Sequence, residues 1–327
     1  MLWQVKQLGT GLKVDDAHLL ALTNGGGIRA TIKQGDITKD NVHTVLPFGN
    51  TITVAYVTGA QLLEALEAST FCTPASIGGF PQASGIQFTV DTSKAYAPNT
   101  ATYPNSTYYG PASINRVTIN SINGQAFDPA AIYGVVTNNF CAAGGDTYYA
   151  FTGASGQLDT GLLMDETLMN YITKELGGVV GQTYAKEQNR VVVYSNTATY
   201  NVVSDAKTVT TYSVSDNAPV SLHIDGDMAK FICVYMDGIL VNAANYAVSE
   251  GSTIITFAPE YLKTLSVGNH TAKAVFTDGT ATAVLTINGA ATSPATGDSS
   301  NVVVYTILGL TALLGTGIVV GKKKELF

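Results

Sequence analysis

The chain has 327 residues, of which 46% are hydrophobic and only 13% are charged, against roughly 25% charged residues in an average soluble domain. The net charge is −7 with 17 Lys and Arg residues, which provides no basic field for phosphates and argues against nucleic-acid binding. Three Cys and four His, none of them clustered, argue against a disulfide framework, a structural zinc site and a self-contained metallohydrolase.

The first residues have the pattern of an amphipathic helix. Leu2, Val5 and Leu8 recur every three residues and form one side of a helix. No N-cap residue precedes them, so the pattern predicts a helix that is cut in the middle. The segment has no apolar h-region and no cleavage site, and no N-terminal signal peptide is therefore expected.

Residues 1 to about 195 mix helical and strand patterns, which predicts an α+β or α/β domain with an extensive sheet. Thr58 and Gln61 have the spacing of a capping box before an apolar face, so a helix is predicted over residues 59–69. A second helix is predicted over residues 165–176, with Asp165 as its N-cap. Strands are predicted over residues 51–57, 86–90, 116–122, 131–137 and 190–194.

Residues 203–288 carry a different pattern, in which short β-rich runs are separated by Asp-Gly or Gly turns. This spacing is typical of a small all-β sandwich of immunoglobulin type. The predicted strands cover residues 220–224, 231–236, 246–248, 253–257, 270–277 and 280–287. Residues 261–271, followed by Phe276-Thr277-Asp278-Gly279, resemble the X2 module of bacterial surface proteins, which implies a spacer or a weak glycan contact.

Three islands at strand ends stand out in the first 195 residues. Asn24-Gly25-Gly26-Gly27-Ile28-Arg29 lets the backbone approach a ligand, although a tight turn would use the same glycines. Phe48 lies in a Pro-Phe-Gly corner, where it is either buried or displayed. Phe140 and Asp146 flank a double-Gly turn, where Asp146 also suits the capping of local amides.

One explanation unites the three islands. Two phenylalanine rings can hold a planar base between them, and such stacking contributes roughly 1–3 kcal/mol per base. A carboxylate can accept both hydroxyls of a ribose, while an Arg and an Asn can bind the sugar–phosphate side. The islands therefore predict a nucleoside or nucleotide pocket built from loops.

The residues that carry this pattern resemble a known family. The motifs Asn24-Gly-Gly-Gly-Ile-Arg29, Leu46-Pro-Phe-Gly49, Phe80-Pro-Gln-Ala-Ser-Gly-Ile86 and Asn139-Phe-Cys-Ala-Ala-Gly-Gly-Asp146 are similar, in order and spacing, to the C-terminal domain of 5′-nucleotidases and UDP-sugar hydrolases. The resemblance implies a four-layered α/β/β/α fold that binds the nucleoside of the substrate. It implies stacking by Phe48 and Phe140, a ribose contact from Asp146, a polar pair of Asn24 and Arg29, and a close-packed loop at Gly85 beside the base.

The sequence also departs from that family. Hydrolysis there belongs to an N-terminal metallophosphoesterase domain, whose two divalent metal ions are held by Asp-x-His, Gly-Asp-x-x-Asp and Asn-His-Glu motifs. The Gly-Asp-x-x-Asp and Asn-His-Glu motifs do not occur in this chain, and the Arg-x-x-Glu-x-Asn segment that usually opens the C-terminal domain is missing. We therefore expect no catalytic residue and no cofactor of its own here, and an inactive chain when it stands alone. Cys141 has no accompanying His in sequence and is expected to be a packed thiol.

The C-terminal region has the features of a surface anchor. Residues 301–321 contain no charge, and a helix over 302–320 would span about 28 Å, close to the bilayer core. The basic tail 322–327 that follows predicts a cytoplasmic end. Pro294, Thr296 and Gly297 precede the span and resemble the LPxTG signal that sortase cleaves between Thr and Gly to link a chain to peptidoglycan. A buried core helix and a plain tail anchor are the alternatives.

The sequence thus predicts five segments: a truncated nucleotidase C-terminal domain at 1–197, an X2-like sandwich at 203–288, a linker at 289–300, a transmembrane helix at 301–321 and a basic tail at 322–327. The leading hypothesis is the nucleotide-binding half of a 5′-nucleotidase anchored to the surface of a Gram-positive bacterium. Its expected partners are a nucleoside or nucleotide, the metallophosphoesterase domain, sortase, the cell wall and the membrane. The alternative is a non-enzymatic, wall-anchored binding or adhesion protein.

Overall fold

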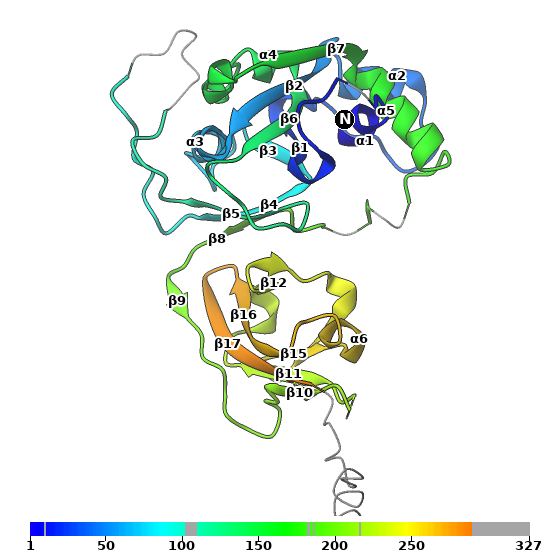
Figure 1. Ribbon diagram of the computed structural model, residues 1–327. Coiled ribbons are helices and arrows are strands. Elements are labelled where there is room, and N and C mark those ends of the chain that lie inside the picture. Colours follow the sequence, from blue (N-terminus) through cyan, green and yellow to red (C-terminus); the bar gives the residue numbers. More distant parts are fainter. Residues whose placement is uncertain (10, 102–109, 182–183, 186, 216, 290–327) are drawn as a thin grey trace, which may run out of the picture.

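The computed structural model describes residues 1–289, apart from residues 10, 102–109, 182–183, 186 and 216. The predicted sorting motif, membrane span and basic tail lie outside these residues. Within the described part of the chain, no helix is both long enough and apolar enough to cross a membrane. Figure 1 shows two bodies, one built from residues 1 to about 195 and one from the strands that follow.

The elements have the following bounds. The α-helices are α1 (Leu2–Lys6), α2 (Lys39–Val45), α3 (Gly59–Ser69), α4 (Asn139–Ala142), α5 (Met164–Asn170) and α6 (Pro259–Leu262), and a π-helical turn (Tyr171–Glu175) extends α5. The strands of the first body are β1 (Leu19–Asn24), β2 (Thr51–Thr58), β3 (Pro81–Ser84), β4 (Ile86–Asp91), β5 (Val117–Ile122), β6 (Ile132–Asn138), β7 (Gln157–Leu163) and β8 (Val191–Tyr194). Those of the second body are β9 (Ala198–Thr199), β10 (Thr211–Ser213), β11 (Val220–Ile224), β12 (Phe231–Met236), β13 (Ile239–Leu240), β14 (Tyr246–Glu250), β15 (Thr253–Phe257), β16 (Gly268–Phe276) and β17 (Gly279–Asn288).

The first body contains two sheets, which confirms the predicted mixed α and β domain. The larger sheet has the order β3-β1-β6-β2-β7, with β1 and β6 parallel and the other neighbours antiparallel. The smaller sheet has the order β5-β4-β8, with β8 parallel to β4. All five predicted strands of this region are present, with ends that differ by one residue at most.

The three central strands of the larger sheet, β1, β6 and β2, are buried on both faces, because apolar residues follow one another along them. Leu20 and Leu22 of β1 face a core shared with Phe88 of the smaller sheet. Leu19 and Ala21 face the opposite way, into a core that includes α1 and the start of α5. The larger sheet therefore lies between a helical layer and the smaller sheet.

Helix α3 confirms the predicted capping box. The Thr58 hydroxyl accepts from the Gln61 backbone N at 3.2 Å, and Gln61 Oε1 accepts from the Thr58 backbone N at 2.9 Å. The helix buries Leu62, Ala65 and Leu66, and it contacts both sheets through β2 and β5. Its ends are those that the sequence predicts.

The predicted second helix needs two corrections. The helix begins one residue earlier than expected, with Leu163 at the N-cap, so Asp165 is not the cap. The Asp165 carboxylate lies inside the first turn, where it accepts from the Glu166 backbone N and contacts His43 instead. The α-helix also changes to a π-helical turn at Tyr171, where Leu176 N donates to Tyr171 O. Gly177 ends it with a positive φ, as expected.

The second body is a two-sheet sandwich. Its sheets have the orders β10-β17-β16-β12-β13, with β9 on β17, and β11-β15-β14. Apolar residues from both sheets, among them Leu222, Ile255, Val234 and Leu285, form one core. The predicted strands are confirmed, and three of them have the expected ends. The likeness to X2 modules stays a prediction.

The two bodies contact each other through the outer face of the smaller sheet. Val192 and Tyr194 of β8 form a buried cluster with Cys233, Tyr235 and Val275 of the sandwich. The connecting segment is also paired, because β9 lies parallel to β17 with Ala198 opposite Gly279. The sandwich thus covers the face of the smaller sheet that points away from the larger one.

Candidate functional site

The three islands meet at one edge of the larger sheet. Because β1 and β6 are parallel, their carboxyl ends lie side by side. Strand β2 runs the other way and pairs Ile52 with Asn138, so its beginning lies at the same edge. The loops that carry Asn24, Phe48 and Phe140 are therefore neighbours, as the sequence analysis predicts.

Asp146 is held by a chain of side-chain amides. Asn24 Nδ2 donates to Asp146 Oδ2 at 2.7 Å, and Asn24 Oδ1 accepts from Asn138 Nδ2 at 2.9 Å. Asn138 Nδ2 also contacts Thr23 Oγ1 at 3.0 Å, and Asn138 Oδ1 caps α4 by accepting from Cys141 N. Asn138 is fully buried and Asn24 is 5% exposed, so the network is rigid where it reaches Asp146.

Phe140 lies against the turn that carries Asp146. A Cβ atom added at Gly145 would come within 2.5 Å of the Phe140 ring, so the ring rests directly on the Gly145 backbone. The side chain is nevertheless 45% exposed. Asp146 itself has a φ of +50°, a conformation that Asp adopts more readily than most residues. The turn therefore presents a ring and a carboxylate side by side.

Phe48 is displayed, not buried. It is 59% exposed, and the Arg29 guanidinium lies over its ring with Cζ 5.9 Å from the ring centroid. Arg29 Nη1 also donates to Gly26 O at 3.1 Å, which fixes the guanidinium beside the glycine turn. An exposed aromatic ring next to a cation is a surface on which a planar anionic ligand can bind.

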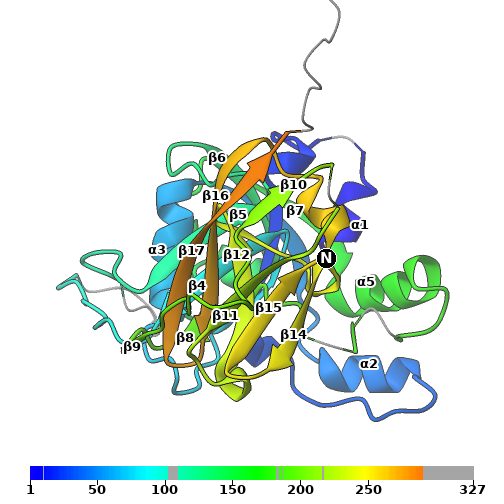
Figure 2. The same cartoon turned by 90° about the horizontal axis from the view of Figure 1, so that it is seen from below.

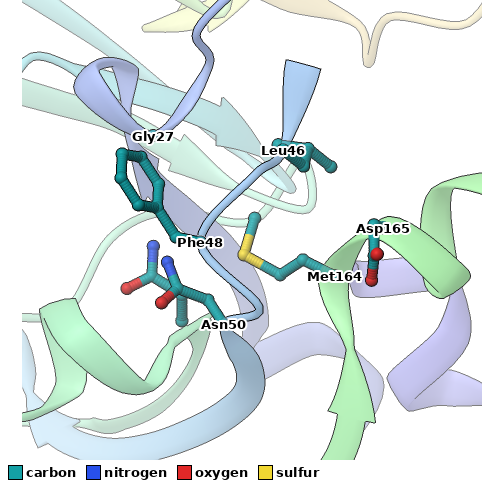
Figure 3. A pocket seen from close by; sticks show the side chains of 7 residues that line it. Gly27, Leu46, Phe48, Asn50, Met164 and Asp165 are labelled. Atoms are coloured by element: carbon teal, nitrogen blue, oxygen red, sulfur yellow. The ribbon is translucent and has the colours of Figure 1, made fainter. Parts of the chain in front are cut away.

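A small hollow lies beneath Phe48. Figure 3 shows its lining, which comes from two loops, the end of β6 and the start of α5; the lining residues are Gly27, Leu46, Phe48, Asn50, Asn138, Met164 and Asp165. The hollow has a volume of about 10 Å³, enough for a single water molecule. A nucleoside cannot enter it, so the exposed ring faces above it are the surface available to a base.

Gly85 does not join the other predicted residues. Strands β1 and β3 pair Asn24 with Pro81 and Ala21 with Ser84, so Gly85 lies beyond the opposite end of β1. At the rise of a strand, this places it roughly 15 Å from Asn24. A Cβ atom there would meet Asn123 and Leu2, and its φ is +74°. We therefore correct the prediction and assign Gly85 to a tight strand connection.

Sequence reasoning missed two features of the site. Asn138 joins Asn24 to α4, and the signal for it was its place as a polar residue just before a helical turn. His43 of α2 contacts Asp165 of α5, with Nδ1 2.8 Å from Oδ2. These two residues are 122 positions apart in the chain, and neither belongs to a local motif.

Cys141 is not a nucleophile in this site. It is fully buried beside Phe140, and burial raises the pKa of its thiol to about 12. The thiol therefore stays protonated at neutral pH, as expected of a packed residue. Among the described residues, no group of three or more His, Cys, Asp or Glu side chains is placed to hold a metal ion.

Comparison with known proteins gives the same assignment as the motifs. Residues 5–153 match the family model of the 5′-nucleotidase C-terminal domain. The chain is 41% identical over 163 residues to the trifunctional nucleotide phosphoesterase protein YfkN of Bacillus subtilis. This match covers 49% of this chain and 10% of YfkN. It is 34% identical over 154 residues to protein UshA of Escherichia coli, which covers 47% of this chain and 24% of UshA.

A solved structure, the 5′-nucleotidase precursor from Thermus thermophilus, is 36% identical, with a TM-score of 0.46 over 59% of this chain and 33% of that one. The matches thus span a third or less of each of these relatives. At the other end of the chain, residues 294–325 match the LPXTG cell wall anchor motif. Residues 5–153 are therefore a 5′-nucleotidase C-terminal domain, and residues 294–325 carry a cell wall anchor.

Proposed function

We propose that residues 1–197 bind the nucleoside part of a nucleotide for a 5′-nucleotidase displayed on the surface of a Gram-positive bacterium. One observation carries this proposal above the others. Asp146 is fixed by Asn24 at 2.7 Å and lies beside the exposed ring of Phe140. A fixed carboxylate next to an exposed aromatic face suits a ribose attached to a planar base.

Each residue then has a distinct role. The rings of Phe48 and Phe140 stack on the base, and Asp146 accepts the ribose hydroxyls. Arg29 can bind the phosphate, because its guanidinium offers several donors in a planar fork. Asn50 lines the hollow beside Phe48 and can bond to the edge of the base. Asn24 fixes the Asp146 carboxylate by donating a hydrogen bond to it.

The anchor sets where this binding takes place. The LPXTG match supports cleavage by sortase between Thr296 and Gly297 and transfer to peptidoglycan. We propose that residues 301–321 span the membrane before this step and that residues 322–327 lie in the cytoplasm. The binding domain would then meet nucleotides outside the cell.

Hydrolysis itself would need a metallophosphoesterase domain with two divalent ions, of the kind that the family resemblance implies. Such ions activate water and stabilise the charge on the phosphoryl group. The Gly-Asp-x-x-Asp and Asn-His-Glu motifs do not occur in this sequence, and its one Asp-x-His triplet, Asp16-Ala17-His18, belongs to no group of three or more metal-ligating side chains among the described residues. We therefore propose that the chain supplies binding and orientation of the nucleotide, while the phosphate is released by groups outside it.

The test is calorimetric titration of the purified chain with AMP. Phe140→Ala should weaken binding by about 1–3 kcal/mol, the contribution of one stacked base. Val284→Ala, at a 54% exposed position of the sandwich, is the control and should bind like the parent chain. Equal binding by the parent chain and Phe140→Ala would contradict the stacking role of Phe140. Phosphate release from AMP by the chain alone with Mn²⁺ would contradict the proposal that groups outside the chain carry out hydrolysis.

A further inference from the structure

A second and larger cavity lies on the helical face of the first body. This groove, which we call the Trp3 groove, runs between α1, the edge strand β3 and the π-helical turn after α5. Its volume is about 530 Å³, within the range of small-molecule sites. It shares no lining residue with the hollow beneath Phe48.

Aromatic side chains form one wall of the groove. Trp3 meets Tyr171 edge to face, with ring centroids 5.6 Å apart. The hydroxyl of Tyr171 lies 2.6 Å from that of Tyr184, which joins three aromatic side chains into one wall. Tyr171 begins the π-helical turn and Glu175 ends it, and both line the groove. Such turns are rare and frequently occur at functional sites.

The groove contains the guanidinium of Arg190, which can bind an anion. Arg190 and Lys6 line it together with one carboxylate, Glu175. Lys6 is paired with Asp16 at 3.2 Å, whereas Arg190 Nη1 donates to the Ala83 carbonyl at 3.1 Å, a bond that uses one of five guanidinium donors. The hydrogen bond with Tyr184 raises the pKa of Tyr171 to about 12, so the Tyr171 hydroxyl stays neutral at physiological pH.

The hydrogen bond from Arg190 to the Ala83 carbonyl disfavours a peptide as the occupant of the groove. An extended peptide binds beside an edge strand by pairing with its backbone groups. Arg190 already occupies the Ala83 carbonyl of β3, which protects the edge against such pairing. We propose that the Trp3 groove binds a small ligand that carries a planar ring and an anionic group, with the ring against Trp3 and Tyr171 and the anion on Arg190.

The chain offers a direct probe of this site, because Trp3 is its only tryptophan. Excitation at wavelengths that tyrosine does not absorb reports on the groove and not on the Phe48 and Phe140 loops. We would titrate the purified chain with benzoate, with AMP and with benzyl alcohol, which has the ring without the charge. Benzoate or AMP should change Trp3 emission saturably, and benzyl alcohol should bind at least about tenfold more weakly because it lacks the charge-assisted hydrogen bonds.

Variants separate this site from the nucleoside site. Arg190→Gln should lose about tenfold or more in affinity, whereas Arg29→Gln, which lies in the other site, should leave the Trp3 response unchanged. If Arg190→Gln fails to fold, Tyr184→Phe serves as the second variant. It removes one hydroxyl and keeps the ring, so it should keep the saturable response, and loss of the response would count against the aromatic wall. No saturable response to either anion, or equal affinity in Arg190→Gln, or loss of the response in Arg29→Gln, would overturn the proposal.

Discussion

Two buried asparagines set the position of the Asp146 carboxylate. Asn138 binds Asn24, and Asn24 binds Asp146, so the position of this carboxylate depends on two buried residues. The motif around residue 24 was visible in the sequence, but its partner 114 residues away was not. Local patterns identify which residues are unusual, whereas only the folded sheet shows which of them touch.

Gly145 offers a test of how the Phe140 ring is placed. Gly145→Ala would bring a Cβ atom to 2.5 Å from the ring, so the ring must move off the turn. We expect weaker AMP binding in calorimetry, by no more than the 1–3 kcal/mol of a lost stacking contact. Gly289→Ala, whose nearest neighbour would be Val267 at 3.6 Å, is the matched control and should bind AMP normally. Unchanged binding in Gly145→Ala would show that the ring position does not matter.

His270 gives a pH dependence to the stability of the sandwich. Its Nδ1 lies 2.5 Å from Asp237 Oδ2 and its Nε2 lies 2.8 Å from Ser266 O, so both nitrogens donate in the charged form. Burial acts to lower the pKa of His270, but these two hydrogen bonds outweigh it and raise the pKa above 6.5. The stabilisation is therefore complete below about pH 6.5 and is lost as the pH rises through the folded-state pKa.

We expect the melting temperature of the sandwich to fall as the pH is raised across that window. His270→Gln should flatten the profile, since glutamine does not titrate. His18→Gln is the control, because His18 belongs to the first body and its side chain is largely exposed. A profile of the same slope in His270→Gln would refute the assignment.

At the scale of elements, the capping box at Thr58 was a reliable signal, whereas the cap predicted at Asp165 was wrong. Thr58 and Gln61 predicted where α3 begins, because their pairing satisfies backbone groups that the first turn of a helix leaves open. The cap of α2 has the same geometry between Thr38 and Asn41, but Asn replaces the usual Glu or Gln, and that helix was not predicted. The π-helical turn after α5 was also missed, because its residues have no distinctive spacing.

The α3 cap can be tested directly. Thr58→Ala removes the hydroxyl that accepts from Gln61 N, and the loss of such a cap typically costs about 1 kcal/mol of unfolding free energy. Urea denaturation of the chain should show this loss, while Thr58→Ser, which keeps the hydroxyl, should stay close to the parent. If alanine and serine variants unfold alike, the cap contributes nothing measurable.

At the scale of the molecule, the contact between the two bodies was beyond sequence reasoning. The sequence predicted the five strands of the first body that were named and the change to a sandwich, because alternation and turn residues are local signals. The sequence around Val192 and Tyr194 has the pattern of an ordinary strand. Nothing in that pattern indicates that Cys233 and Tyr235 cover these two side chains. Contacts between distant segments depend on the shape of both surfaces.

This contact should couple the unfolding of the two bodies. Tyr194 is 8% exposed, and Tyr194→Ala would leave a cavity in the buried cluster, at a cost of about 3–5 kcal/mol for a large aromatic residue. Calorimetry of the parent chain should show one transition, and the variant should show two or a single transition at lower temperature. Tyr184→Ala, at a 39% exposed position away from the contact, should leave the transition in place. Two separate transitions in the parent chain would contradict the coupling.

The paired segment between the bodies has a consequence for the way the domain is presented. Ser195 N donates to Thr277 O and Ala198 N to Asp278 O, and a side chain at Gly279 would strike the Ala198 carbonyl, so the crossing is locked to β17 and does not act as a swivel. The chain leaves the described structure after β17, at the end of the sandwich that points away from the first body (Figures 1 and 2). A protein tethered at that end would hold its nucleotidase C-terminal domain outward, with the sandwich as a fixed spacer between that domain and the tether.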